Sequence, residues 1–347
     1  MTGFDPDAAA QPGSGLFGLD AEPSEAGIVV VPVPFAATVS YGGGAEHGPD
    51  AVLAASHQVD LYDWHFGRTY EAGIAMLPAD PAVAAAHERA RALAAPIVAR
   101  GGVPAGDPAV QEIDAAGELV NNSLRSRALP CLQRGQIVGV LGGDHSVPFA
   151  AIEAAAELAP LGILHIDAHA DMRCAYEGFR WSHASIMHNV LELCPGVERL
   201  VQIGVRDYGE AELRAIHDSG GRVVTHFDAD VQLRRLMGES FDSIVEEVLA
   251  ALPQRIWISC DIDGLDPSLC PNSGTPVPGG LQFAELAHLF ARVANSGRSI
   301  VGFDLVEVAP SARYPDAAAG EWDANVGARV LYKLCGAAAR SRHNAAP

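Results

Sequence analysis

Short and almost continuously apolar runs recur along the chain and alternate with longer amphipathic or alanine-rich stretches. The apolar runs predict strands over residues 27–33, 72–77, 137–141, 161–166, 200–205, 222–225, 255–259 and 299–303. The stretches between them predict helices, for example over residues 50–56, 81–100, 109–132, 243–252 and 283–295. Strands that are apolar on both faces are typical of a covered parallel sheet. About eight such strands alternating with helices therefore predict an α/β protein with a mostly parallel sheet.

The first 26 residues differ from the rest because they are poor in aliphatic residues and rich in turn formers. We predict that residues 1–26 form a flexible N-terminal arm, or a segment that wraps a neighbouring subunit. No internal repeat or change of composition follows. Residues 27–347 are therefore predicted to form a single domain.

Composition narrows the class of protein. The longest apolar runs are far shorter than the ~20 residues of a membrane helix, and the N-terminus lacks the pattern of a secretion signal. The six cysteines form no Cys-x-x-Cys pair, which favours reduced thiols in the cytoplasm. A formal charge of −20 argues against nucleic acid as a partner and slightly favours cationic substrates. We expect a cytoplasmic protein with no membrane or nucleic-acid partner.

Acidic and imidazole side chains follow three of the predicted strands. Asp167, His169 and Asp171 come at alternate positions after residues 161–166, and in an extended backbone such positions share one face. Asp261 and Asp263 follow residues 255–259 in the same way, and His145 follows residues 137–141. Because ligands gather at the carboxyl ends of parallel strands, these six side chains are predicted to converge on one metal site.

The predicted ligands are four carboxylates and two imidazoles, with no thiolate. This set suits Mn(II), with Ni(II), Fe(II) or Co(II) as alternatives, and six side chains can hold two ions if a carboxylate bridges them. A water shared by two cations loses a proton near neutral pH, which is hydrolytic chemistry. Any one of these aspartates could instead cap a helix or turn, but capping does not explain the whole group.

Five motifs in one order extend this interpretation. They are Gly-Gly-Asp-His-Ser at residues 142–146, Asp-Ala-His-Ala-Asp at 167–171, Ser-Cys-Asp-Ile-Asp-Gly-Leu-Asp-Pro at 259–267, residues 274–280 and residues 306–308. Over about residues 28–337 the chain resembles the ureohydrolase family, which includes arginases and agmatinases. The resemblance implies a three-layer α/β/α fold around an eight-stranded parallel sheet and a binuclear manganese centre. It also implies cleavage of a guanidino group to release urea, in trimers or hexamers.

The resemblance also assigns roles beyond metal binding. Glu307 matches the residue that pairs with the substrate guanidinium, a cation that a carboxylate holds well. His183 matches the histidine that passes a proton to the leaving amine. Asp171 is expected to accept a hydrogen bond from the shared water and to relay its proton. Thr275, in the fourth motif, is expected to contact the substrate.

The specificity loops are predicted at residues 35–41 and 172–182. The second loop lacks the Asn, Ser and Thr donors with which arginases hold the amino-acid end of arginine, so arginine is disfavoured. After His183 the chain has Ala-Ser-Ile-Met at residues 184–187, where many agmatinases have a sequence of the type His-Gly-Thr. Glu177 could meet a terminal amine, and Arg173 or Arg180 a carboxylate such as that of guanidinobutyrate.

Trp181, with Tyr176 and Phe179, could close the pocket around a substrate as small as guanidine. We predict an agmatinase-like enzyme that converts agmatine to putrescine and urea, with a guanidine hydrolase, possibly using Ni(II), and then a guanidinobutyrase as alternatives. Two other classes remain open: a histone-deacetylase-like hydrolase with one zinc, and a non-catalytic binding protein. Metal counting would separate the first of these, since we predict two divalent ions in each chain.

Overall fold

The computed structural model describes residues 4–11, 13–104, 106–311 and 321–345. Its centre is an eight-stranded sheet in the order β2-β1-β3-β8-β7-β4-β5-β6, and every pairing is parallel. The strands are β1 (Ile28–Val33), β2 (Ile74–Met76), β3 (Ile137–Gly142), β4 (Leu161–Ile166), β5 (Val197–Ile203), β6 (Val223–His226), β7 (Arg255–Asp261) and β8 (Ser299–Val306). The predicted eight-stranded parallel sheet is confirmed.

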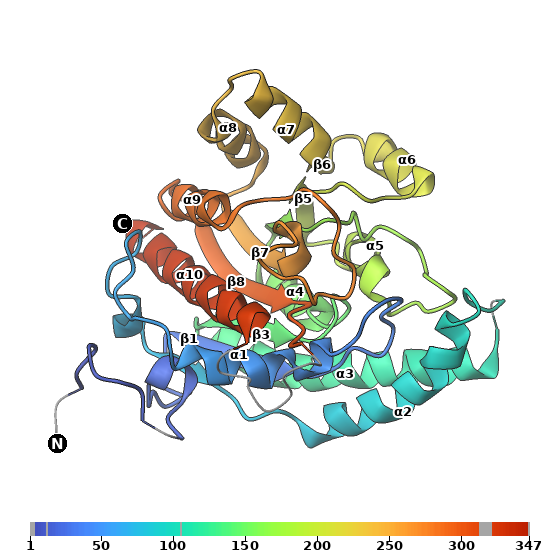
Figure 1. Ribbon diagram of the computed structural model, residues 1–347, viewed down its shortest axis with the longest axis horizontal. Helices are drawn as coiled ribbons and strands as arrows, with labels where there is room; N and C mark the ends of the chain where they lie inside the picture. Colours follow the sequence, from blue (N-terminus) through green and yellow to red (C-terminus); the bar gives the residue numbers. More distant parts are fainter. Residues whose placement is uncertain (1–3, 12, 105, 312–320, 346–347) are drawn as a thin grey trace.

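Helices cover both faces of this sheet (Figure 1). The first face carries α1 (Gly48–Ser56), α8 (Phe241–Ala251), α9 (Phe283–Ala294) and α10 (Trp322–Ala345). The second carries α2 (Pro81–Val98), α3 (Pro108–Gln133), α4 (Phe149–Leu158), α5 (Ile186–Leu193) and α6 (Glu210–Asp218). A further helix, α7 (Asp228–Leu236), follows β6. The fold is thus the expected three-layer α/β/α arrangement.

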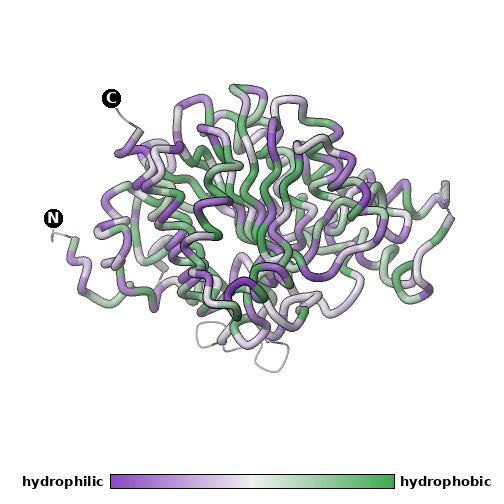
Figure 2. The backbone as a smooth tube through the Cα atoms, turned by 90° about the horizontal axis from the view of Figure 1, so that it is seen from above, coloured by the Kyte–Doolittle hydropathy of each residue, from purple (hydrophilic) through white to green (hydrophobic). Residues whose placement is uncertain are grey.

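Alternation along the strands divides the core into two apolar clusters. In β1, Ile28 and Val30 pack in the cluster under α1 and α10, whereas Val29 and Val31 pack in the cluster under α3 and α4. Both sets are buried because the sheet is covered on both sides. Hydrophobic positions dominate the central strands, and hydrophilic positions gather at one end of them (Figure 2).

The helices α2 and α3 begin with matching sequence signals. Asp80 and Asp107 are their N-caps, and in each case a carboxylate oxygen accepts a hydrogen bond of 2.9 Å from a backbone N–H two residues on. A proline at the first helical position follows each cap, where the missing N–H costs nothing. The helices predicted over 81–100 and 109–132 end within two residues of these bounds.

Residues 16–26 contact the domain directly. Leu16 and Phe17 are buried in the cluster under α1 and α10, and the Phe17 backbone N–H donates to Ser56 Oγ at 2.9 Å. The amide of Gln136 donates to the carbonyl oxygens of Pro23 and Ala26. The mobility predicted for residues 1–26 and the single domain predicted for 27–347 stay predictions. Across the described ranges, none of the helices combines the length and apolarity needed to cross a membrane.

The sheet order brings the predicted ligands to one edge. The central strands β3, β8, β7 and β4 are neighbours and end at the same level, as the pairing of Asp261 with Val306 illustrates. The last strand in sequence, β8, lies between β3 and β7. Side chains that follow these four strands therefore meet above the middle of the sheet.

Candidate functional site

Four of the predicted ligands form a first buried group. His145 follows β3, and its Nδ1 lies 2.9 Å from Asp167 Oδ2, 3.2 Å from Asp171 Oδ2 and 3.2 Å from Asp261 Oδ2. All four side chains are buried. Three carboxylate oxygens and one imidazole nitrogen at these distances are suitable ligand atoms for a divalent cation.

A second group lies next to the first. His169 Nδ1 lies 3.3 Å from Asp167 Oδ1 and 3.2 Å from Asp263 Oδ2. Asp167 thus offers one carboxylate oxygen to each group. Six side chains in two groups that share the Asp167 carboxylate fit two neighbouring divalent cations.

The charges of this cluster also fit bound cations. Burial, together with the neighbouring Asp263 and Asp167, raises the pKa of Asp261 well above its ordinary value. Burial and the charge of Asp167 likewise raise the pKa of Asp171, to about 7. Buried carboxylates that repel one another are costly, and divalent cations at the same oxygens would offset that cost.

The local backbone differs from the extended geometry that we predicted for residues 167–171. Strand β4 ends at Ile166, and Asp167 Oδ1 accepts a hydrogen bond from the His169 backbone N–H at 2.6 Å. Asp261 Oδ1 accepts in the same way from the Asp263 N–H at 2.8 Å. Each carboxylate thus closes a turn on its own chain, so turns rather than strand alternation aim these ligands.

Left-handed backbone conformations mark the same region. Among the described residues, the non-glycine residues with positive φ are Phe17, Asp171, Glu177 and Glu307. Asp171 has φ 54° and Glu307 has φ 61°, values that cost free energy for a side chain without glycine's freedom. Such strain commonly accompanies functional residues, and both residues belong to the predicted site.

A buried chain behind His145 was not predicted from the sequence. His145 Nε2 lies 2.9 Å from Ser259 Oγ, which donates to Asp304 Oδ1 at 2.9 Å. The Trp257 indole N–H donates to Asp304 Oδ2 at 2.6 Å. Asp304 is fully buried, and burial raises its pKa to about 6. The sequence feature that could have indicated this chain is the presence of polar residues, Ser259 and Asp304, inside otherwise apolar strands.

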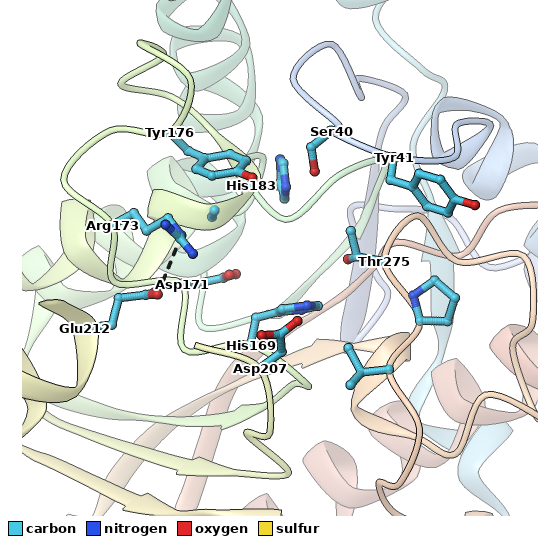
Figure 3. Close-up of a pocket in the computed structure, with 13 residues that line it drawn as sticks. Ser40, Tyr41, His169, Asp171, Arg173, Tyr176, His183, Asp207, Glu212 and Thr275 are labelled. Carbon is cyan, nitrogen blue, oxygen red and sulfur yellow. Dashed lines mark ion pairs between the residues drawn. The ribbon is translucent and has the colours of Figure 1, made fainter. Parts of the chain in front are cut away.

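A cavity of about 330 Å³ opens above the second group of ligands (Figure 3). Its lining residues are Ser40, Tyr41, His169, Asp171, Arg173, Tyr176, His183, Ala184, Asp207, Glu212, Thr275, Pro276 and Val277. Arg173, Tyr176 and Glu212 lie on one side of it, with Tyr41 and Thr275 opposite. Thr275 Oγ1 donates to Asp263 Oδ2 at 3.2 Å, which joins the wall of the cavity to the ligand cluster.

Two buried polar atoms near the ligands have no partner among the described residues. Glu307 Oε1 accepts from the His145 backbone N–H at 3.1 Å, whereas its Oε2 is unpartnered. Burial, with the charges of Asp144 and Asp263, raises the pKa of Glu307 well above its ordinary value. A cation placed against Oε2 would satisfy this oxygen and favour its ionised form.

His183 holds the second unpartnered atom, Nδ1. Its backbone N–H faces Thr38 Oγ1 at 3.4 Å, and its ring packs edge-on against Tyr176 with centroids 5.9 Å apart. Burial and the nearby His169 and His145 lower the pKa of His183 to about 3. The imidazole is therefore neutral at pH 7 and can accept a proton at Nδ1.

Of the residues predicted to bind substrate, Thr275 lines the cavity, whereas Glu307, Trp181 and Glu177 lie outside its lining. Trp181 is buried against Phe149, with ring centroids 4.8 Å apart, and against Gly117, where a Cβ would clash with its side chain. Glu177 occupies the tight turn at which Tyr176 and Phe179 pair. These positions follow from the way this loop folds onto α2 and α3.

The alternative substrate guanidine was considered because three aromatic rings of the same loop, Tyr176, Phe179 and Trp181, could close the pocket around it. Phe179 is instead fully buried in a cluster with Ala94 and Ile97 of α2 and Val110 and Ile113 of α3. Of the three rings, Tyr176 alone lines the cavity. The loop is thus anchored by Phe179 and leaves open space above the ligands.

Comparison with known proteins relates this fold and site to a family. Residues 26–336 match the model of the arginase family. The chain is 34% identical over 297 residues to N(1)-aminopropylagmatine ureohydrolase of Thermus thermophilus, covering 85% of this chain and 87% of that one. It is 31% identical over 296 residues to proclavaminate amidinohydrolase of Streptomyces clavuligerus, covering 84% and 83%.

Solved structures agree on the fold. Agmatine ureohydrolase of Thermoplasma volcanium superposes with a TM-score of 0.69 at 24% identity, covering 93% of each chain. Parallel strands, a buried cluster of carboxylates and imidazoles at their ends, and these relatives together define a hydrolase. The chain belongs to the arginase family and is a ureohydrolase. Members of this family typically bind a binuclear metal centre, and the buried cluster around Asp167 fits one.

Proposed function

We propose that the protein hydrolyses the guanidino group of a small cationic guanidino compound, with agmatine as the first candidate and putrescine and urea as products. The observation that carries the proposal is Glu307 Oε2, a buried atom beside the ligand cluster that has no partner among the described residues. The cavity of about 330 Å³ above the cluster offers space for a substrate. The proposed metal ligands are His145, Asp167, His169, Asp171, Asp261 and Asp263. We propose Mn(II) as the metal, with Ni(II) as the alternative; when bound, two such cations activate water for attack.

The protein groups have distinct tasks in this reaction. Glu307 holds the guanidinium by a charge-assisted hydrogen bond, so that its carbon faces the ligand cluster. Asp171 accepts the proton that the attacking water gives up. His183, neutral at pH 7, takes up this proton at Nδ1 once Asp171 releases it, and passes it to the nitrogen of the leaving amine as the carbon–nitrogen bond breaks. Urea and the amine are then released.

The cavity supports a substrate with a tail. Guanidine alone has four non-hydrogen atoms, and the two aromatic rings expected to close the pocket around it lie elsewhere. Asp207 and Glu212 face the cavity with Arg173, whose guanidinium pairs with Glu212 at 3.5 Å. The remaining carboxylate favours an amine at the far end of the substrate. The names of the relatives, agmatinase and aminopropylagmatine ureohydrolase, point the same way.

Arg173 supports a second candidate. It stacks on Tyr176, with its guanidinium carbon 4.8 Å from the ring centroid, and it lines the cavity. If it released Glu212, it could bind a carboxylate at the far end of the substrate, as in guanidinobutyrate. The balance between Arg173 and the two acidic residues would then set which tail is accepted.

Urea release should be measured with agmatine, N(1)-aminopropylagmatine, guanidinobutyrate, arginine and guanidine, using Mn(II)- and Ni(II)-loaded protein. We expect kcat/KM to be highest for one of the two amine-tailed substrates. Glu307→Gln keeps the shape but loses the charge, and should lower kcat/KM by about 100-fold or more. Arg173→Gln should lower turnover of guanidinobutyrate selectively. Turnover of guanidine alone would refute an agmatinase-like activity.

Arginase-family members are commonly oligomers. For this chain we propose a trimer or hexamer in the cytoplasm, and light scattering of the purified protein tests the assembly.

A further inference from the structure

His165 is a fully buried imidazole near the end of β4, two residues before the shared ligand Asp167. Its Nε2 lies 2.9 Å from Asp167 Oδ2, the oxygen that also faces His145. The sequence did not single it out, because it interrupts an otherwise apolar strand. Its position close to the ligand cluster could suit either a further ligand or a group that orients Asp167.

The neighbouring strands decide between these two roles. Gln202 of β5 pairs in register with His165, and its Nε2 lies 2.9 Å from the Ala170 carbonyl oxygen and 3.0 Å from His165 Nδ1. A carbonyl oxygen only accepts hydrogen bonds, so the amide atom facing it is the donating nitrogen. The amide oxygen of Gln202 then accepts from Thr225 Oγ1 of β6 at 2.8 Å.

This orientation fixes the tautomer of His165. Its Nδ1 accepts the hydrogen bond from Gln202, so the single ring proton of the neutral imidazole is on Nε2 and is donated to Asp167. Neither ring nitrogen has a free lone pair for a metal, so the geometry does not suit a seventh ligand.

We propose that His165 is a positioning residue for Asp167, held in one tautomer by Gln202 of the adjacent strand β5, which is itself oriented by Thr225 of β6. Its N–H fixes Oδ2 so that the two oxygens of Asp167 face separate ligand groups. The inference rests on the metal centre proposed above. Groups that orient metal ligands in this way typically contribute about 10- to 100-fold to metal affinity or activity.

Manganese release from the loaded protein tests the role. The rate of transfer of Mn(II) to a chelator and the Mn(II) content are measured for the wild type and variants, with the melting temperature of the metal-free forms as a check on folding. His165→Leu removes the donor and should speed release by about 10- to 100-fold. His165→Gln keeps a donating nitrogen and an accepting oxygen, and should stay close to the wild type.

Two further variants separate positioning from general destabilisation. Gln202→Leu removes the group that fixes the tautomer and should speed release less than His165→Leu does; it also serves if His165→Leu fails to fold. His226→Leu, an equivalent change at the end of β6, should leave release unchanged. Release from His165→Leu at the wild-type rate, or equal losses in the Leu and Gln variants, would overturn the inference. A wild type that takes up no divalent cation would refute the metal centre itself.

Discussion

Among the described residues, the buried imidazole and carboxylate atoms without a partner are Glu307 Oε2, His183 Nδ1, Glu177 Oε2 and His226 Nε2. Glu307 lies beside the predicted ligand His145, and His183 lines the cavity, so a bound substrate could satisfy both atoms. His226 Nε2 is also unpartnered, but it lies at the end of β6 and outside the cavity lining. Burying this atom without a hydrogen bond lowers the stability of the fold and has no role in catalysis.

His226 should therefore make stability depend on pH. Burial lowers its pKa in the folded protein below the ordinary value of about 6.5. The unfolded chain then binds more protons than the folded one between these two values. The contribution of neutral His226 is present above pH 6.5 and is lost as the pH falls through the folded pKa. Relative to the wild type, His226→Gln should be more stable at pH 5 than at pH 8.

Urea unfolding of both proteins at several pH values measures this difference. The comparison cancels the titration of the ligand cluster, which both proteins share. A difference in the free energy of unfolding that is the same at pH 5 and pH 8 would contradict the assignment.

The convergence of the six proposed ligands could be predicted because each follows an apolar run at a short spacing. The sequence did not predict His165, Ser259 and Asp304, since a single polar residue in an apolar strand has no periodic signal of its own. The position of Glu177 and Trp181 outside the cavity lining also has no signal in the sequence. Their direction depends on where Phe179 is buried, and that contact lies between segments far apart in sequence.

At the level of elements, the strands were predicted better than the segments that join them. Alternation and apolar runs located all eight strands, but β8 continues to Val306 and β7 to Asp261, beyond the predicted ends. The polar residues Asp304 and Asp261 made those ends look like loops. Partners across the sheet satisfy Asp304, and tertiary contacts of this kind are absent from a sequence pattern.

One loop is attached to α10 by an ion pair of the chain's sole lysine. Lys333 Nζ lies 2.7 Å from Asp63 Oδ2, and Asp63 Oδ1 accepts from the backbone N–H groups of His65 and Phe66. Lys333→Met would leave the buried Asp63 carboxylate without its cation. We expect a loss of roughly 3 kcal/mol in the free energy of unfolding.

The double variant Asp63→Asn with Lys333→Met removes both charges and should recover much of that loss. Chemical denaturation of the two single variants and the double variant completes the cycle. Additive losses would show that the two groups do not interact.

At the level of the whole molecule, the carboxylates around Asp167 link metal binding to folding. The repulsion that raises the pKa of Asp261 and Asp171 also opposes the folded state. Bound cations should therefore stabilise the fold, by about 2.7 kcal/mol at a free concentration 100 times the dissociation constant. Removal of metal by a chelator should lower the melting temperature, and added Mn(II) should restore it.

Calorimetry of the metal-free, reloaded and His169→Ala proteins checks this expectation. His169→Ala should lose most of the stabilisation by Mn(II) while keeping the fold. An unchanged melting temperature after complete metal removal would contradict the link between binding and stability.

The place of β8 has a consequence for synthesis on the ribosome. His145 follows β3, whereas Asp167 and Asp261 belong to the β4–β7 side, and the final strand separates the two sets. A nascent chain that has emerged only as far as β7 has a gap in the middle of its sheet, with two unpaired strand edges. The sheet therefore cannot be completed until residue 306 has left the exit tunnel. A chain that ends before β8 should form two separate sheet fragments, which cannot share a catalytic centre.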